Sequence, residues 1–176
     1  QPFPKIFEEA HFSLAQLHLT TNNPQKAEEV LTKIIEKYSQ EEIQRGYYLS
    51  RSWYELGNIA FNKKDISLAL TLFKKSEQTS RGKVLSIEQK LKLWIKQSSC
   101  YKALNDLDNA MLMLSKVINE DAVSSLRIQA MFLRAEIYEL QGRNELAIKQ
   151  LESVSKQNSD WSLKAKEKLE KTFGFN

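Results

Sequence analysis

Two histidines and one cysteine are the side chains of this 176-residue chain that are best suited by type to chemistry. His11 and His18 lie seven residues apart, so on a helix they share one face and could offer two metal ligands. No third ligand stands near them in sequence, and we therefore favour packing for both. Cys100 has no His or Asn signature around it, and as the single Cys it excludes an intrachain disulfide. No metal and no cofactor is predicted.

The acidic residues and short motifs give no catalytic constellation either. Glu8-Glu9 and Glu28-Glu29 are neighbours on expected helices and face different directions, which does not suit paired acid–base work. The sequence has no phosphate loop, no G-x-S-x-G and no H-E-x-x-H. We predict that the protein is not an enzyme.

Chain-breaking residues are scarce, and this decides the expected secondary structure. The chain has five Gly and three Pro, and all three Pro lie within the first 24 residues. A β-sandwich or barrel needs a turn signal roughly every dozen residues, whereas a Leu-, Lys- and Glu-rich run without breakers is typical of helices. We expect an all-α protein.

Charge and hydropathy exclude further classes. The chain has 26 Lys and Arg against 22 Asp and Glu, and the basic residues are interleaved with acidic ones, as on solvated helices. Nucleic acid is therefore a disfavoured partner. No stretch reaches the roughly 18 apolar residues of a transmembrane helix. Because the chain starts at Gln1, we expect a processed product or a piece of a longer protein, with its targeting segment removed. The compartment stays open between cytoplasm and bacterial periplasm or cell envelope.

A pattern of bulky and small residues recurs four times. The clearest copy runs from Trp53 to Phe73 in the order W-x2-L-G-x2-A-x8-A-x3-F. In every copy a small residue precedes an Ala by twelve positions, as expected where two helices cross closely. The pairs are Ala15 and Ala27, Gly57 and Ala69, Ser98 and Ala110, and Ala135 and Ala147.

This order resembles the tetratricopeptide repeat, a 34-residue helix–turn–helix unit. The resemblance implies an all-α, right-handed α-α superhelix (a TPR solenoid) of four helix pairs plus a C-terminal capping helix. It also implies a single domain over residues 1–176, with repeat cores at about 8–41, 50–83, 91–124 and 128–161 and the capping helix at about 160–172.

Two departures from the family pattern point to long repeats. The consensus Pro is replaced by Ser39, Arg81, Ala122 and Ser159, and successive small residues lie 42, 41 and 37 apart. We therefore expect one helix over Glu41–Phe61, with Gly46 as a position of a kink or boundary, and a loop over 80–83. Long repeats of this kind are similar to those of bacterial cell-envelope scaffolds, namely outer-membrane assembly lipoproteins and Tol-Pal coordinator proteins.

Helix starts can be predicted from capping residues. Pro24 suits a first helical turn, and Asp65, Asp108, Asn144 and Asp160 can each accept hydrogen bonds from free N–H groups at a helix start. In the last helix Trp161, Ala165, Leu169 and Phe173 recur every fourth residue, which favours a cap over the end of the repeats. A helix lying on a membrane surface is the alternative.

The resemblance also implies a concave groove lined by positions 2, 5, 9 and 12 of each first helix. Position 5 is apolar or aromatic in all four repeats, so these side chains either anchor a partner or pack against neighbouring helices. The positions carry Glu9, Phe12, Gln16 and Leu19, then Arg51, Tyr54, Asn58 and Phe61, then Lys92, Ile95, Ser99 and Lys102, and finally Gln129, Phe132, Glu136 and Glu139.

The predicted function is a non-catalytic scaffold that binds a peptide or helix of a protein partner in this groove. Basic residues of the second and third repeats and acidic residues of the fourth would give polarity. The family's chaperone-type carboxylate clamp is disfavoured, because Glu55 stands at one of its positions. Two other functions stay open: a peptide-responsive regulatory domain that controls an attached effector, and RNA binding through the Lys-rich surface.

Overall fold

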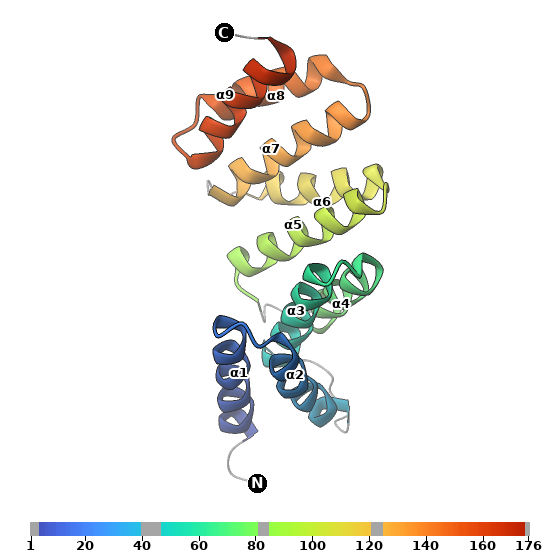
Figure 1. Cartoon of the computed structure of the whole chain (residues 1–176), viewed down its shortest axis with the longest axis vertical. Coiled ribbons are helices and arrows are strands. Elements are labelled where there is room, and N and C mark those ends of the chain that lie inside the picture. Colours follow the sequence, from blue (N-terminus) through green and yellow to red (C-terminus); the bar gives the residue numbers. More distant parts are fainter. Residues whose placement is uncertain (1–3, 40–46, 81–84, 121–124, 175–176) are drawn as a thin grey trace. The chain divides into compact units, whose positions relative to one another are not determined.

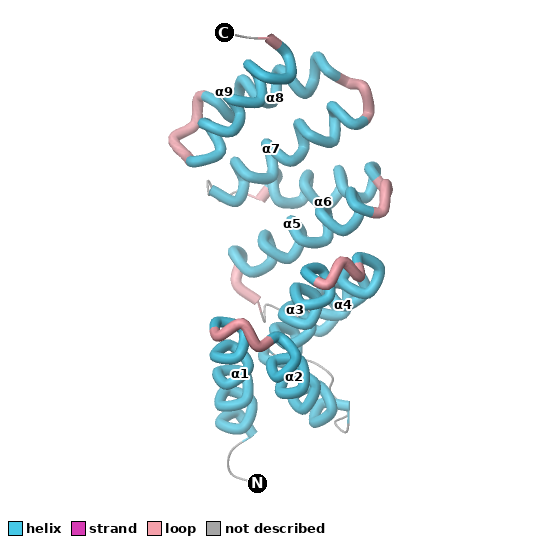
Figure 2. The backbone as a smooth tube through the Cα atoms, in the orientation of Figure 1, coloured by secondary structure: helices cyan, strands magenta, loops and turns pink. Residues whose placement is uncertain are grey.

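The computed structural model describes residues 4–39, 47–80, 85–120 and 125–174, and the regular secondary structure within these ranges is entirely helical (Figures 1 and 2). The helices are α1 (Pro4–Thr20), α2 (Pro24–Ser39), α3 (Tyr47–Asn62), α4 (Ile66–Thr79), α5 (Ile87–Ala103), α6 (Leu107–Asn119), α7 (Ser125–Leu140), α8 (Asn144–Ser155) and α9 (Asp160–Phe173).

Each helix pair turns in the same way, at a residue in the left-handed conformation. The φ angle is 58° at Asn22, 67° at Lys64, 59° at Asn105 and 70° at Gly142. Each of these residues follows the small residue of its repeat by seven positions. The next N–H along the chain then donates to a carbonyl five residues back, at 2.8 to 3.0 Å, which ends the first helix.

The predicted helix starts are correct in part. α2 begins at Pro24, and Asp65 accepts from the N–H of Leu68 at 3.1 Å, as expected. For α6 the cap is Asp106, which accepts from the N–H of Asn109 at 3.2 Å, so the prediction of Asp108 was wrong. The cap is Asp106 because it is the residue that follows the left-handed Asn105.

The predicted caps of the last two helices were also wrong. Arg143 stands before α8 without a side-chain cap, and Asn144 is already helical. Ser159 stands before α9, and its N–H donates to Ser162 Oγ at 3.2 Å, while Asp160 lies in the first turn of the helix.

The chain divides into two compact units, Gln1–Leu93 and Trp94–Asn176, and their boundary falls inside α5. In the first unit α1 packs on α2, α2 on α3 and α3 on α4. α2 contributes a stripe at helical spacing to a shared apolar core, because its buried residues recur every three or four positions. This core comprises Phe12, Ala15, Ala27, Val30, Leu31, Ile34, Leu49 and Ile59.

The second unit packs α6 on α7, α7 on α8 and α9 on both α7 and α8. Its core around α9 comprises Phe132, Ala135, Leu151, Val154, Ala165 and Leu169, with Trp161 and Phe173 packed against it. The face of α9 that points away from this core carries Lys166, Glu167 and Glu170, all exposed. α9 therefore covers an apolar face and presents charged residues to water, which is the capping arrangement.

The predicted long helix over Glu41–Phe61 is described only from Tyr47, where α3 begins, and α3 continues to Asn62. Residues 41–46, with Gly46, lie outside the described residues. Of the predicted loop over 80–83, Ser80 follows α4 directly and its N–H donates to the Glu77 carbonyl at 3.2 Å; residues 81–83 lie outside the described residues.

Gly57 lies where α3 packs tightly against a side chain of α4. A Cβ added there would lie 2.6 Å from Cε1 of Phe73, and the three nearest heavy atoms all belong to that ring. The need for a small residue is thus confirmed, and the ring of Phe73 is the nearest group that a side chain here would meet. In the third repeat the predicted pair does meet, because Ser98 Oγ donates to the Ala110 carbonyl at 3.0 Å.

Candidate partner-binding surfaces

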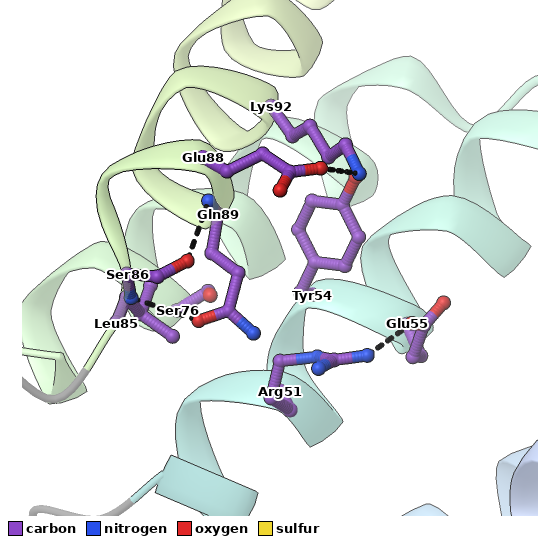
Figure 3. Close-up of a pocket in the computed structure, with 9 residues that line it drawn as sticks. All are labelled: Arg51, Tyr54, Glu55, Ser76, Leu85, Ser86, Glu88, Gln89 and Lys92. Atoms are coloured by element: carbon purple, nitrogen blue, oxygen red, sulfur yellow. Dashed lines mark hydrogen bonds and ion pairs between the residues drawn. The ribbon is translucent and has the colours of Figure 1, made fainter.

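A cavity of about 360 Å³ lies in the first unit among α3, α4 and the start of α5 (Figure 3). Figure 3 shows the ring of Tyr54 between Arg51 of α3 on one side and Glu88 and Lys92 of α5 on the other. The cavity is lined by Arg51, Tyr54, Glu55, Ser76, Leu85, Ser86, Glu88, Gln89 and Lys92. Arg51, Tyr54 and Lys92 are three of the residues that the repeat frame predicts for binding.

The charged side chains of the cavity form two ion pairs. Arg51 Nη2 lies 3.6 Å from Glu55 Oε1, and Lys92 Nζ lies 2.6 Å from Glu88 Oε1. The hydrogen bond from Lys92, and then its charge, lowers the pKa of the Glu88 carboxyl. Two positive and two negative charges line the cavity, so its formal charge is zero and its walls are polar without favouring an anion or a cation.

Tyr54 supplies the aromatic surface of the cavity. Its ring is half-buried, with the ring centroid 5.6 Å from that of Phe73. Burial, followed by the charge of Glu55, raises the pKa of the Tyr54 hydroxyl. The hydroxyl therefore stays protonated at neutral pH and can both donate and accept a hydrogen bond.

Tyr47 joins the two helices that flank the cavity. Arg51 Nη1 donates to the Tyr47 hydroxyl at 2.9 Å, and Gln89 Nε2 donates to the same oxygen at 3.1 Å. The guanidinium of Arg51 also lies 4.9 Å from the ring centroid of Phe12 and 5.7 Å from that of Tyr47. These contacts hold Arg51 in place, so the side chain is positioned before any partner arrives.

Sequence reasoning missed most of the α5 wall. The N–H of Ser86 donates to Gln89 Oε1 at 2.9 Å, and the N–H of Gln89 donates to Ser86 Oγ at 3.2 Å. This reciprocal pair is a capping box, and the run Ser-Ile-Glu-Gln at 86–89 is the signal that could have revealed it. The sequence carries no such signal for Ser76 on α4. Its hydroxyl is buried and donates to the Ser50 carbonyl at 2.8 Å.

The other predicted residues of the first unit lie outside this cavity. Phe12 keeps only 7% of its surface exposed and belongs to the core, against which Leu19 also packs. Gln16, Asn58 and Phe61 are half-buried. The sequence left open whether Phe12 anchors a partner or packs against neighbouring helices. In the structure it packs against neighbouring helices.

In the second unit a shallow hollow of about 620 Å³ lies between α7 and α9. The ring of Trp161 is its aromatic wall, with Lys164 Nζ 4.1 Å from the ring centroid and the Phe132 ring 5.3 Å away. The hollow is lined by Phe132, Leu133, Glu136, Trp161, Lys164, Glu167, Lys168, Lys171 and Thr172. The predicted positions on first helices contribute Phe132 and Glu136 to it.

The apolar predicted residues of the second unit are buried. Ile95 is 6% exposed and Phe132 is 7% exposed, so Phe132 reaches the hollow with little surface. Ser99 is turned back onto its own helix, where its hydroxyl donates to the Ile95 carbonyl at 3.0 Å. Gln129 is half-buried.

The charged predicted residues of the second unit are paired with opposite charges. Lys102 Nζ lies 2.8 Å from Glu136 Oε2, and Lys168 Nζ lies 2.8 Å from Glu139 Oε2. These ion pairs balance the charges of Lys102, Glu136 and Glu139 locally.

The residues that were candidates for chemistry have structural surroundings. His11 Nδ1 donates to the Phe7 carbonyl at 2.8 Å, and its ring centroid lies 3.9 Å from that of Phe7. Cys100 is fully buried, and burial raises the pKa of its thiol to about 11. The described part of the chain holds no cluster of three His, Cys, Asp or Glu side chains that could bind a metal. Among its helices none has the length and apolarity needed to cross a membrane.

These features define an all-α repeat protein whose helix pairs position polar and aromatic surfaces. Family models described as "Tetratricopeptide repeat" match residues 8–36, 50–81 and 91–123, and residues 129–160. The chain therefore belongs to the tetratricopeptide repeat family and is an all-α TPR solenoid. This fold generally serves as a non-catalytic scaffold for protein–protein interaction, so the class of partner is protein.

Solved structures share the fold at low sequence identity. MamA is 17% identical with a TM-score of 0.65, over 92% of this chain and 79% of that chain. Nearly identical TPR-like repeats from Podosopora anserina are 16% identical with a TM-score of 0.70, over 92% and 82%. A tetratricopeptide repeat protein from Parabacteroides merdae is 16% identical with a TM-score of 0.70, over 96% and 60%. No curated protein matches the sequence.

Proposed function

We propose that this chain binds a short segment of a partner protein, and that the cavity around Tyr54 takes one of that segment's apolar side chains. The observation that carries the proposal is the cavity itself, because it combines a half-buried aromatic ring with polar groups held on three helices. A site with an apolar anchor and a few fixed polar groups is the general form of a recognition pocket.

The cavity indicates what kind of side chain it would accept. Tyr54 and Leu85 offer apolar contact, and Leu85 is only 6% exposed, so it gives a firm wall. Because the four charges of the lining cancel, a charged side chain would gain little from them. An aromatic or branched aliphatic side chain fits this environment best, and the polar groups would bond to the backbone on either side of it.

The neutral lining also sets the expected response to salt. Binding that depends on unpaired charges weakens steeply as salt is added, because the attraction is screened. Here we expect an affinity that changes little with salt. A steep loss of affinity would instead favour a charged partner and would contradict this account of the cavity.

The test is a selection of peptides from a displayed random library against the wild-type chain, followed by calorimetric titration of the selected peptides. Tyr54→Ala should weaken binding by about 10- to 100-fold, the range typical for a central aromatic contact. Tyr101→Ala is the matched control: it removes a half-buried Tyr from α5, in the second unit, and should leave the affinity unchanged. Both variants must keep the helical circular dichroism of the wild type. Equal affinities for wild type and Tyr54→Ala would place the peptide site elsewhere.

A further inference from the structure

A second cavity of the first unit lies between the first and second repeats, with walls from α2, α3 and α4 and from the turn that joins α3 to α4. We call it the α2–α4 cavity. Its volume is about 380 Å³, which is within the roughly 300–1,000 Å³ of ligand pockets. It is lined by Glu28, Thr32, Leu56, Ile59, Ala60, Lys63, Asp65, Leu68 and Leu72.

The α2–α4 cavity has an apolar floor and an apolar rim residue. Ile59, Ala60 and Leu72 are buried, so the floor consists of side chains that packing holds in place. Leu68 also lines the cavity and is 47% exposed. A large apolar side chain of a partner would therefore fill the cavity and also remove Leu68 from water.

The second repeat lacks a ring that the other three repeats carry at one position of this cavity. Ala60 follows Gly57, the small residue of its repeat, by three positions. Because Ala60 is buried and lines the cavity, only a methyl group occupies this position in the second repeat. At the same offset the other repeats have His18, Tyr101 and Tyr138.

The fourth repeat shows where such a ring lies. The guanidinium of Arg143 is 5.1 Å from the centroid of the Tyr138 ring. Arg143 follows Ala135 by eight positions, as Asp65 follows Gly57. The ring therefore lies beside the residue whose counterpart, Asp65, lines the α2–α4 cavity. An aromatic ring is thus a group that the fold accommodates at this place.

The wall opposite differs between the same two repeats. Leu56 and Leu72 line the cavity in the second repeat, and at their offsets the fourth repeat has Arg134 and Gln150. Arg134 Nε donates to Gln150 Oε1 at 3.0 Å, so these two polar side chains satisfy each other. The second repeat instead offers two apolar side chains, which favour an apolar ring from outside.

The charges of the rim indicate which ring is favoured. Lys63 Nζ lies 2.8 Å from Glu28 Oε2, and this ion pair leaves Asp65 as the unbalanced charge among the described residues of the lining. Asp65 Oδ1 accepts from the N–H of Leu68 at 3.1 Å. Because a carboxylate has two oxygens, Asp65 can accept a further hydrogen bond from a partner. A ring that carries an O–H or N–H, next to a basic residue, matches this rim.

We propose that the α2–α4 cavity binds a Tyr or Trp side chain of a partner protein that has a Lys or Arg next to it in sequence. The ring takes the place that Tyr138 fills within the fourth repeat, its O–H or N–H donates to Asp65, and the basic neighbour balances the charge of the rim. This proposal is independent of the function proposed for the cavity around Tyr54, because the two cavities are lined by different residues.

A ¹H–¹⁵N NMR titration of the whole chain with two synthetic peptides tests the proposal. The peptides are acetyl-Lys-Trp-Lys-amide and acetyl-Lys-Ala-Lys-amide. The Trp peptide should shift the amide signals of Ala60 and Leu68 with a dissociation constant of about 1 mM, as expected for one well-buried side chain. The Ala peptide should give no saturable shift. A Trp peptide that gives no saturable shift at these residues up to about 10 mM would overturn the proposal.

Two variants locate the ring. Ala60→Tyr fills the cavity from within, with the residue that the third and fourth repeats have. It should weaken binding of the Trp peptide at least about 10-fold, with a thermal midpoint no lower than that of the wild type, because the added ring gains packing contacts. Asp65→Asn keeps a capping side chain and removes the charge, and it should weaken binding about threefold to tenfold. Unchanged affinity in the folded variants would overturn the proposal.

Asn62→Tyr is the matched control for the added ring. Asn62 is exposed on α3 and lies outside the lining, so this variant should keep the dissociation constant within about twofold of the wild-type value. Tyr54→Ala separates the two cavities and should leave the shifts at Ala60 and Leu68 unchanged. Binding that is lost in Tyr54→Ala and retained in Ala60→Tyr would place the ring in the other cavity and overturn the proposal.

Discussion

Replacing Gly57 with Ala tests how closely α3 and α4 pack in the first unit. The added Cβ would lie 2.6 Å from Cε1 and 2.7 Å from Cδ1 of Phe73. Carbon atoms in ordinary contact are about 3.5–4.0 Å apart, so the ring would have to move by about 1 Å. Phe73 has no exposed surface, and a displaced ring would push into other side chains of the core.

Two opposing effects set the size of the change. Overpacking a filled core costs about 1–3 kcal/mol, whereas replacing Gly by Ala inside a helix gains about 1 kcal/mol. Since a contact at 2.6 Å is far inside the repulsive range, we take the upper end of the cost. The expected net loss in the free energy of unfolding is about 2 kcal/mol, or about 4–8 °C in the midpoint for a chain of this size.

The other repeats indicate a rescue. Sixteen residues after its small residue, each copy has one large side chain, and only the copy that contains Gly57 has Phe there. The four residues are Leu31, Phe73, Leu114 and Leu151. Phe73→Leu alone should cost about 1–2 kcal/mol through the cavity that it leaves. Combined with Gly57→Ala, it gives the second repeat the pair of side chains that the fourth repeat has, Ala135 and Leu151. The loss in the free energy of unfolding of the double variant should therefore be smaller than the sum of the two single losses by at least about 1 kcal/mol.

Urea unfolding followed by far-UV circular dichroism gives the three free energies of this cycle. Ala135→Gly, in the fourth repeat, is the reverse control. It should cost about 1 kcal/mol of helix propensity and about 1 kcal/mol more for the loss of a fully buried methyl group. If Gly57→Ala instead raises the free energy of unfolding by about 1 kcal/mol, the gain in helix propensity accounts for the whole change. The close contact with Phe73 would then have no destabilising effect, and our reasoning would be refuted.

Three further predictions concern single residues. Lys64 sits at φ 67°, so Lys64→Gly should raise the free energy of unfolding by about 1 kcal/mol in urea titrations, whereas Lys64→Ala, which keeps the Cβ strain, should not. Asp65→Ala should lower it by about 1 kcal/mol because the N–H of Leu68 loses its acceptor, and Asp108→Ala should change it by much less; equal losses would contradict the caps described above. The thiol pKa of Cys100 is raised from 9.0 to about 11 in the folded chain. The contribution of this thiol to the free energy of unfolding is therefore complete below about pH 9 and is lost as the pH rises to about 11. Between about pH 8 and about pH 10.5 the wild type should therefore lose about 2 kcal/mol more than Cys100→Ala, and equal losses would show that the buried thiol does not resist ionisation.

The helix pairs and their turns could be predicted from the sequence because they depend on local spacing. A small residue, a bulky flank and an Ala twelve positions on define a pair of crossing helices wherever they occur. The caps were harder to predict: Asp106 and Asp108 are both suitable residues, and the choice falls on Asp106 because it follows the left-handed Asn105. The left-handed conformation of Asn105 is set by the turn. The residue type at the cap therefore does not reveal where the helix begins.

The residues predicted for binding divide in a similar way. The repeat frame placed Arg51, Tyr54 and Lys92 on the correct helices, and these three line the cavity of the first unit. It could not tell that Phe12 and Phe132 are core residues, since the same position carries Tyr54, which lines the cavity. The exposure of a side chain depends on which helices pack over it, and the sequence of one repeat does not specify those helices.

By itself the sequence determined the repeat and the family, because both are periodic features of the chain read over short distances. The tertiary structure alone decided which of the predicted residues line a cavity and which are buried. Gln89 donates to Tyr47 across 42 residues of sequence, and that contact joins the α3 and α5 walls of the cavity. That contact depends on which helices come together in space, and no spacing along the chain specifies it.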